Sequence, residues 1–128
     1  MHKPLERILY VEDESDIRTV AKMALESVGG FSVLECSSGS EAIAAAPTAR
    51  ADLILLDVMM PGMDGPTTLL ALRGIAATSA TPVIFMTAKV QAAEIAAYRA
   101  LGALDVVAKP FDPMEVSAEI KRIWSAQP

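Results

Sequence analysis

The sequence LILLDVMMPGMDG, residues 53–65, decides the fold, because four consecutive aliphatic residues end abruptly in an acid and then in turn residues. A continuous apolar run bounded by breakers is typical of a central parallel strand that is covered on both faces. Ligands of open α/β sheets bind beyond the carboxyl ends of such strands, so we expect Asp57 at the mouth of a site. Pro66 is well placed in the first turn of a following helix. The stretch therefore predicts a strand, an acid, a loop and a helix.

Composition restricts the class of protein. The 128 residues are 52% hydrophobic and 21% charged, which predicts one domain over residues 1–128. A net charge of −5 without a run of lysines or arginines argues against direct nucleic-acid binding. The single cysteine, Cys36, excludes an intramolecular disulfide, and the N-terminus lacks the apolar region of a signal peptide. The charge-poor residues 74–88 are too few to span a bilayer, so we expect a cytoplasmic protein that binds no membrane.

Short apolar runs alternate along the chain with segments whose apolar residues recur at helical spacing. This pattern predicts five strands, each followed by a helix. The first helix has apolar residues at helical spacing and stops at Gly29-Gly30. The strands are expected over residues 5–11, 31–35, 52–56, 82–87 and 103–108, and the helices over residues 17–28, 38–46, 66–77 and 91–101 and from 112 onward.

Several residues predict where helices begin and end. Pro47 is expected to end the second helix. Gly74 is expected inside the third helix, where it costs about 1 kcal/mol relative to alanine. Asp112, Pro113 and Glu115 have the order of the N-cap, N1 and N3 residues of a capping box for the fifth helix.

Strands that alternate with helices pair in parallel through right-handed crossovers. The predicted fold class is therefore α/β, a doubly wound five-stranded parallel sheet with helices on both faces. Periodicity does not give the strand order, but the flavodoxin-like order 2-1-3-4-5 is common for five units. This order brings the ends of four strands into one pocket, with Glu12-Asp13, Asp57, Thr87 and Lys109.

This set of residues has a consistent chemistry. Three carboxylates in a small space repel one another, and a hard divalent cation relieves the repulsion. Mg²⁺ favours one or two direct carboxylates with retained waters and a phosphate ligand, which leaves Asp57 an oxygen free to act as a nucleophile. Thr87 and Lys109 would contact the equatorial oxygens of a transferred phosphoryl group. We therefore predict Mg²⁺-dependent phosphoryl transfer to Asp57.

The same residues resemble the receiver domains of bacterial two-component response regulators, including the single-domain chemotaxis regulator, over essentially the whole chain. The resemblance implies that Asp57 accepts a phosphoryl group from the histidine of a sensor kinase or a phosphotransfer protein. The matching motifs are VEDE at 11–14, LLDVMMPGMDG at 55–65, MTA at 86–88 and KPF at 109–111.

The resemblance also implies roles that the residues alone do not give. Asp13 and the backbone carbonyl of Met59 would join Asp57 on Mg²⁺, Glu12 would act through water, and the Lys109-Pro110 bond would be cis. Met59 and Lys89 would flank the path of hydrolytic water. Phosphorylation would change the surface of the fourth helix, fifth strand and fifth helix, which signals to an unidentified effector. Such a domain is a phosphoacceptor switch rather than an enzyme, with slow self-dephosphorylation at most.

One position departs from the family pattern. Three residues before Lys109, where many members have tyrosine or phenylalanine, the chain has Val106. This valine does not affect phosphorylation, but it removes the aromatic side chain that couples the site to the output surface in those members.

Other interpretations use the same residues. Taken singly, Glu12-Asp13 is a solvated turn, Thr87 a strand-end cap and Lys109 a surface charge. Their joint placement favours a site, whereas Cys36 is expected to be a small hydrophobic residue and His2 part of a disordered terminus.

The chain lacks residues that rival classes of protein require. A flavodoxin-type flavin carrier needs a phosphate-cradling loop after the first strand, where Glu12-Asp13 would repel the anion. A haloacid-dehalogenase-like phosphatase needs a second aspartate where the chain has Met59. A receiver-like interaction module without phosphorylation is a further alternative. We expect a complete single-domain regulator, and the alternative is a receiver from a longer regulator or hybrid kinase.

Overall fold

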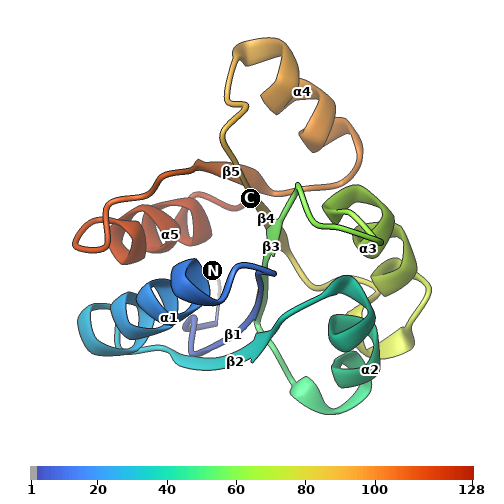
Figure 1. Ribbon diagram of the computed structural model, residues 1–128, viewed down its shortest axis with the longest axis horizontal. Coiled ribbons are helices and arrows are strands. Elements are labelled where there is room, and N and C mark those ends of the chain that lie inside the picture. The colour runs from blue at the N-terminus through green and yellow to red at the C-terminus, as the bar shows by residue number, and fades with distance from the viewer. Residues whose placement is uncertain (1–2) are drawn as a thin grey trace.

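The computed structural model describes residues 3–128, so the expectation for His2 lies outside the described residues. Within that range the chain forms one parallel sheet with the strand order β2-β1-β3-β4-β5 and helices on both faces (Figure 1). The predicted doubly wound fold and strand order are confirmed. The strands are β1 (Arg7–Val11), β2 (Ser32–Cys36), β3 (Leu53–Asp57), β4 (Val83–Thr87) and β5 (Asp105–Ala108).

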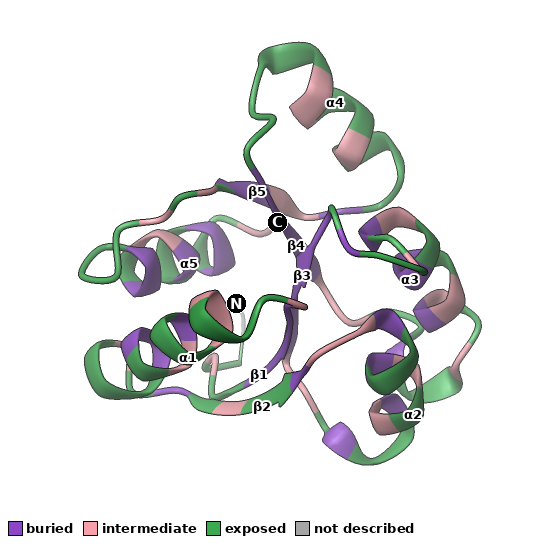
Figure 2. Cartoon of the chain, viewed as in Figure 1, coloured by how far each residue is buried: buried purple, intermediate pink, exposed green. Residues whose placement is uncertain are grey.

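Two apolar clusters hold the sheet between its helices. One face packs against α1 (Ser15–Met23), the π-helical turn η1 (Ala24–Val28) and α5 (Val116–Ser125). The other face packs against α2 (Gly39–Ala49), α3 (Gly65–Arg73) and α4 (Ala92–Ala100). All residues of the central strands β3 and β4 are buried (Figure 2), as the continuous apolar runs predict.

The second helix is longer than predicted, because Pro47 lies inside α2 rather than at its end. A proline in the last turn removes one donor, and the helix continues to Ala49. Arg7 Nη2 donates to the Ala49 carbonyl at 3.0 Å, which satisfies one of the free carbonyls at this end. Arg50 then adopts a left-handed φ of 53° and ends the helix.

The third helix is shorter than predicted, because Gly74 is its C-cap and not an interior residue. The Gly74 N–H donates to the Ala71 carbonyl and the Ile75 N–H to the Leu72 carbonyl, both at 3.1 Å. A separate 3-10 helix, η2 (Ala76–Thr78), follows. It is fixed by the Thr78 hydroxyl, which donates to the Leu72 carbonyl at 2.6 Å.

The predicted capping box of the fifth helix is wrong. The carboxylate of Asp112 accepts from the Met114 N–H at 2.9 Å, and its carbonyl accepts from the Val116 N–H. These bonds make a turn of residues 113–115, so α5 begins only at Val116.

Helix α4 stands out from the body of the molecule in Figure 1 and has no buried residue. Ile95 and Tyr98 pack against the apolar cluster on this face of the sheet. The Tyr98 ring packs edge-on against Phe85 of β4 at 5.3 Å, and Arg99 pairs with Asp105 at 2.9 Å.

Across residues 3–128, every helix is too short or too polar to cross a lipid bilayer.

Candidate functional site

The sheet brings the predicted residues of four strand ends to one edge. Glu12 directly follows β1, and Asp57 and Thr87 are the last residues of β3 and β4. Val11 pairs with Leu56 across β1 and β3, which places Glu12 beside Asp57. Because parallel strands end at the same edge, their last side chains converge there.

Lys109 lies between two of these acids. Its Nζ atom is 2.7 Å from Glu12 Oε1 and 3.2 Å from Asp57 Oδ1, and only 16% of its side chain is exposed. The Lys109-Pro110 bond is cis, as expected, and the Lys109 N–H donates to the Thr87 carbonyl at 3.0 Å. Lys109 is therefore an internal partner of the acids and not a surface charge.

Three carboxylates form a compact oxygen cluster beside this lysine. Oxygen atoms of Glu12, Asp13 and Asp57 all lie within 4.8 Å of one another. Glu12 and Asp57 are buried, and the buried Asp13 Oδ1 has no hydrogen-bond partner among residues 3–128. A buried carboxylate oxygen without a donor and two acids beside it are the ligand set that a hard dication prefers. The residues thus fit Mg²⁺.

Burial and Lys109 shift the pKa values of the acids in opposite directions. Burial raises the pKa of Glu12 to about 7, although the hydrogen bond from Lys109 lowers it. Burial likewise raises the pKa of Asp57 against the attraction of Lys109. Burial alone would lower the pKa of Lys109, but its bonds to Glu12 and Asp57 outweigh burial and raise it. The site therefore has more negative charge than one lysine compensates.

Thr87 combines the two roles considered for it. Its buried Oγ1 accepts from the Lys89 N–H at 3.1 Å, which is the strand-end cap expected of an isolated threonine. A hydroxyl that accepts one bond still has a proton to donate. Thr87 can therefore donate to an anionic group at Asp57 without losing its cap.

The loop after β3 is fitted tightly against the acid. A Cβ atom on Gly65 would lie 2.6 Å from the Asp57 carbonyl oxygen, so only glycine lets α3 start this close to the strand. Asp64 accepts from the Thr67 N–H at 2.8 Å and caps the helix. The Met59 side chain is 67% exposed at the rim, and the metal role of its carbonyl stays a prediction.

Arg18 is the residue at this edge that the sequence did not reveal. Its Nη1 donates to the Glu12 carbonyl at 2.7 Å. An arginine in the second turn of an amphipathic helix is an ordinary surface residue by pattern. Only the three-dimensional arrangement shows that it reaches back to the strand end.

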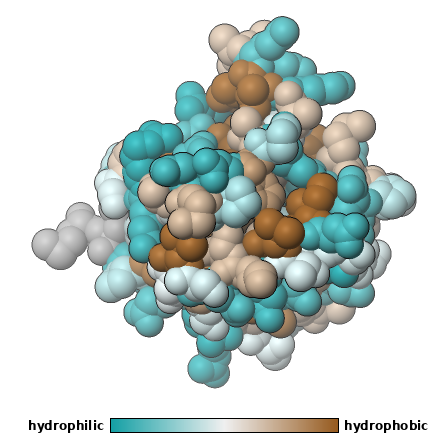
Figure 3. Space-filling model, turned by 60° about the vertical axis from the view of Figure 1, so that its left-hand side comes forward, coloured by the Kyte–Doolittle hydropathy of each residue, from teal (hydrophilic) through white to brown (hydrophobic). Residues whose placement is uncertain are grey.

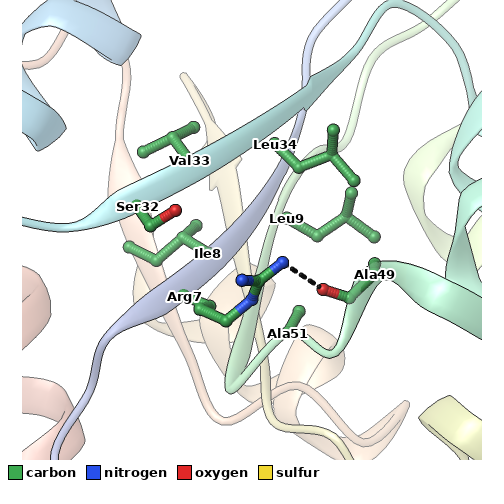
Figure 4. A pocket seen from close by; sticks show the side chains of 8 residues that line it. All are labelled: Arg7, Ile8, Leu9, Ser32, Val33, Leu34, Ala49 and Ala51. Carbon is green, nitrogen blue, oxygen red and sulfur yellow. Dashed lines mark hydrogen bonds between the residues drawn. The ribbon is translucent and has the colours of Figure 1, made fainter.

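A second hollow lies at the opposite end of the strands (Figure 4). This pocket of about 180 Å³ is lined by Arg7, Ser32 and Leu34 among others, and by none of the predicted site residues. In this pocket, Arg7 donates a hydrogen bond to the Ala49 carbonyl. The pocket is therefore separate from the acidic cluster.

Comparison with known proteins relates this site to one family. The model of the response regulator receiver domain matches residues 8–121. ResD, a transcriptional regulatory protein of Bacillus subtilis, is 41% identical over 117 residues, which are 91% of this chain and 47% of ResD. PhoP, the alkaline phosphatase synthesis transcriptional regulatory protein of Bacillus subtilis, is 39% identical over 117 residues, 91% of this chain and 48% of PhoP. The chain spans about half the length of these curated relatives.

A solved structure of similar length has the same fold. The chemotaxis response regulator CheY4 of Vibrio cholerae matches with a TM-score of 0.85 and 30% identity. The match covers 94% of this chain and 99% of CheY4.

Proposed function

The chain belongs to the family of response regulator receiver domains, and on that basis we propose that it is a switch operated by phosphorylation of Asp57. The phosphoryl donor is the phosphohistidine of a sensor kinase or a phosphotransfer protein. The observation that carries the proposal is the buried carboxylate of Asp57 within 3.2 Å of Lys109 and next to two further acids.

The chemistry follows from the positions of these side chains. Asp57 offers a carboxylate oxygen to the phosphorus, and an O–P bond forms as the P–N bond of the donor breaks. The electron pair of that bond stays on the ring nitrogen, and because the other ring nitrogen of the donor carries a proton, the histidine leaves as neutral imidazole. The product is an acyl phosphate on Asp57.

Two side chains then stabilise the transferred group. Lys109 already faces Asp57 and can place its charge on a phosphoryl oxygen. Thr87 can donate its hydroxyl proton to another oxygen while it keeps the bond from Lys89. These contacts are made only when the phosphoryl group is present, so they favour a phosphorylated conformation.

The acidic cluster would hold Mg²⁺ through Asp13 and Asp57, with the Met59 carbonyl as a further ligand and Glu12 acting through water. When bound, the cation supplies positive charge for the phosphoryl oxygens. The need for such charge agrees with the raised pKa values of Glu12 and Asp57.

An apolar groove next to Lys109 supports the approach of a protein donor. The groove has a volume of about 270 Å³ and lies between α1 and the loop after β5, with Ile17, Val20 and Phe111 in its lining. Figure 3 shows one face of the molecule, on which small hydrophobic patches lie among hydrophilic ones. A docking surface beside the lysine would bring the phosphohistidine to Asp57.

For the output we propose the surface of α4, β5 and α5. Movement of Thr87 toward the phosphoryl group would pull on the loop that leads into α4, a helix without buried residues. Val106 is buried in β5 and has no ring to follow that movement. The effector is a protein, and the cytoplasm as the place of action stays a prediction from the sequence.

The relatives differ in how much of their own length matches this chain. The match covers 99% of CheY4 but only about half of ResD and PhoP. In a single-domain regulator and in a receiver joined to other domains alike, the domain is proposed to be a phosphoacceptor switch and not an enzyme.

Intact-mass spectrometry after incubation with acetyl phosphate tests the proposal. We expect a gain of one phosphoryl group in the presence of Mg²⁺ and none when EDTA removes the cation. An unchanged mass with Mg²⁺ in excess would instead favour a receiver-like interaction module that is never phosphorylated.

A further inference from the structure

We infer that Arg18 is a positioning residue that fixes the Glu12-Asp13 backbone and so sets the affinity of the acidic cluster for a divalent cation. The inference rests on the proposed function, since it assigns Arg18 to the same site.

The guanidinium group of Arg18 reaches from α1 back to the end of β1. Its Nη1 donates to the Glu12 carbonyl at 2.7 Å and lies 3.4 Å from the Asp13 carbonyl. Its Nε is 3.9 Å from a carboxylate oxygen of Glu35 on β2. The side chain is 19% exposed, so these contacts are made in a largely shielded place.

These contacts hold the backbone just beyond the point where the hydrogen-bond pairing of β1 with β2 ends. The Glu12 N–H donates to the Cys36 carbonyl at 3.0 Å, which continues the pairing of β1 with β2 by one residue. The carbonyls of Glu12 and Asp13 follow this bond, and Arg18 holds both. Because the backbone sets the direction of each Cα–Cβ bond, Arg18 restricts the region that the two carboxylates can reach.

Charge and geometry predict opposite effects of Arg18 on cation binding. Its positive charge repels a dication, so loss of the charge alone would tighten binding. Its hydrogen bonds hold two ligands in place, so loss of the bonds would weaken binding. Partners that orient metal ligands change the affinity for the metal by about 10- to 100-fold when removed. The sign of the change therefore identifies which effect dominates.

Arg18→Gln and Lys22→Gln make a matched pair for this measurement. Lys22 lies one turn further along α1, is more exposed and pairs at 3.8 Å with Glu26 of η1. Each variant removes one positive charge from α1, but only Arg18→Gln removes the bonds to the strand end. Thermal unfolding without Mg²⁺ checks that both variants fold.

NMR titration with MgCl₂ gives the affinity of each protein and the carboxyl ¹³C resonance of Asp13. We expect Arg18→Gln to bind Mg²⁺ about tenfold more weakly than the wild type and to shift the Asp13 resonance before Mg²⁺ is added. Lys22→Gln should bind at least as tightly as the wild type, with its Asp13 resonance unmoved. If Arg18→Gln does not fold, Arg18→Lys replaces it, because the shorter lysine keeps the charge but lacks the planar guanidinium group that reaches the two carbonyls. It should weaken binding in the same direction.

Unchanged or tighter binding in the folded Arg18 variant would overturn the inference, because charge would then be its main effect. An equal loss in Lys22→Gln would also overturn it. Failure of the wild-type protein to bind Mg²⁺ would contradict the proposed function itself, so the two failures are distinguishable.

Discussion

At the scale of single residues, Lys109 compensates the negative charge of two buried acids. It pairs with Glu12 at 2.7 Å and with Asp57 at 3.2 Å, and removal of one partner of a buried pair leaves uncompensated charge. We expect Lys109→Ala without Mg²⁺ to lower the free energy of unfolding at pH 7.5 by about 3 kcal/mol in urea titrations. The matched variant Lys121→Ala, whose ammonium lies over the Phe31 ring 5.3 Å from its centroid, should cost about 1 kcal/mol at most. Equal losses in both variants would show that Lys109 compensates no buried charge.

Met59 controls a different property, the lifetime of the phosphorylated state. An exposed thioether beside the acceptor orders no attacking water, whereas an amide side chain can orient one. We expect Met59→Asn to shorten the half-life of phosphorylated protein several-fold, measured as loss of the phosphoryl mass with time. Met114→Asn is the control, because Met114 is also 67% exposed but lies outside the loop after β3. An unchanged half-life in Met59→Asn would contradict the role of Met59 at the rim.

At the scale of elements, the contact between β3 and the start of α3 positions the acceptor. A Cβ atom on Gly65 would lie 2.6 Å from the Asp57 carbonyl oxygen and 2.8 Å from Val58 Cα, so the strand end must move. We expect Gly65→Ala to destabilise the protein by about 2 kcal/mol and to reduce the rate of phosphorylation. Gly74→Ala is the control, since its φ of −83° suits alanine and its nearest contact would be 3.4 Å. The two variants should differ clearly in thermal unfolding, and similar behaviour would show that the approach of α3 is not tight.

The elements also show what a sequence can predict. Uninterrupted apolar runs identified β3 and β4, because burial on both faces leaves no polar position. Acids and a lysine after such runs predicted that these side chains converge, because parallel strands end at the same edge of the sheet. Helix ends were less predictable, since they depend on distant partners such as Arg7, which satisfies the last turn of α2 beyond Pro47. The hydrogen bond from Arg18 to the Glu12 carbonyl depends on the path of one long side chain, which the pattern of hydrophobic residues does not predict.

At the scale of the whole molecule, the site makes stability depend on pH. Glu12 titrates near 4.5 when unfolded and near 7 when folded, and the pKa of Asp57 is raised as well. The folded protein thus keeps protons that the unfolded chain has lost, so the stabilising contribution of these groups falls as pH rises from about 4.5 to 7. Asp52 and Asp64 have lowered pKa values and act oppositely, but only in more acidic solution.

Thermal unfolding midpoints in EDTA between pH 4.5 and 8 measure this dependence. We expect the midpoint of Glu12→Gln to fall less steeply with pH than that of the wild type, because the glutamine does not titrate. Excess Mg²⁺ should raise the wild-type midpoint most at the upper end of the range, since a ligand of the folded state stabilises it by mass action. Parallel curves for wild type and Glu12→Gln would contradict the raised pKa of Glu12.

The central claim is that Asp57 itself accepts the phosphoryl group. An acyl phosphate is reduced by borohydride, which converts the modified aspartate to homoserine, and peptide mass spectrometry then locates the conversion. After treatment with acetyl phosphate and Mg²⁺, homoserine is expected at position 57 of the wild-type protein and nowhere in Asp57→Asn. Homoserine at Asp13 or Asp64, or its persistence in Asp57→Asn, would contradict the assignment of the acceptor.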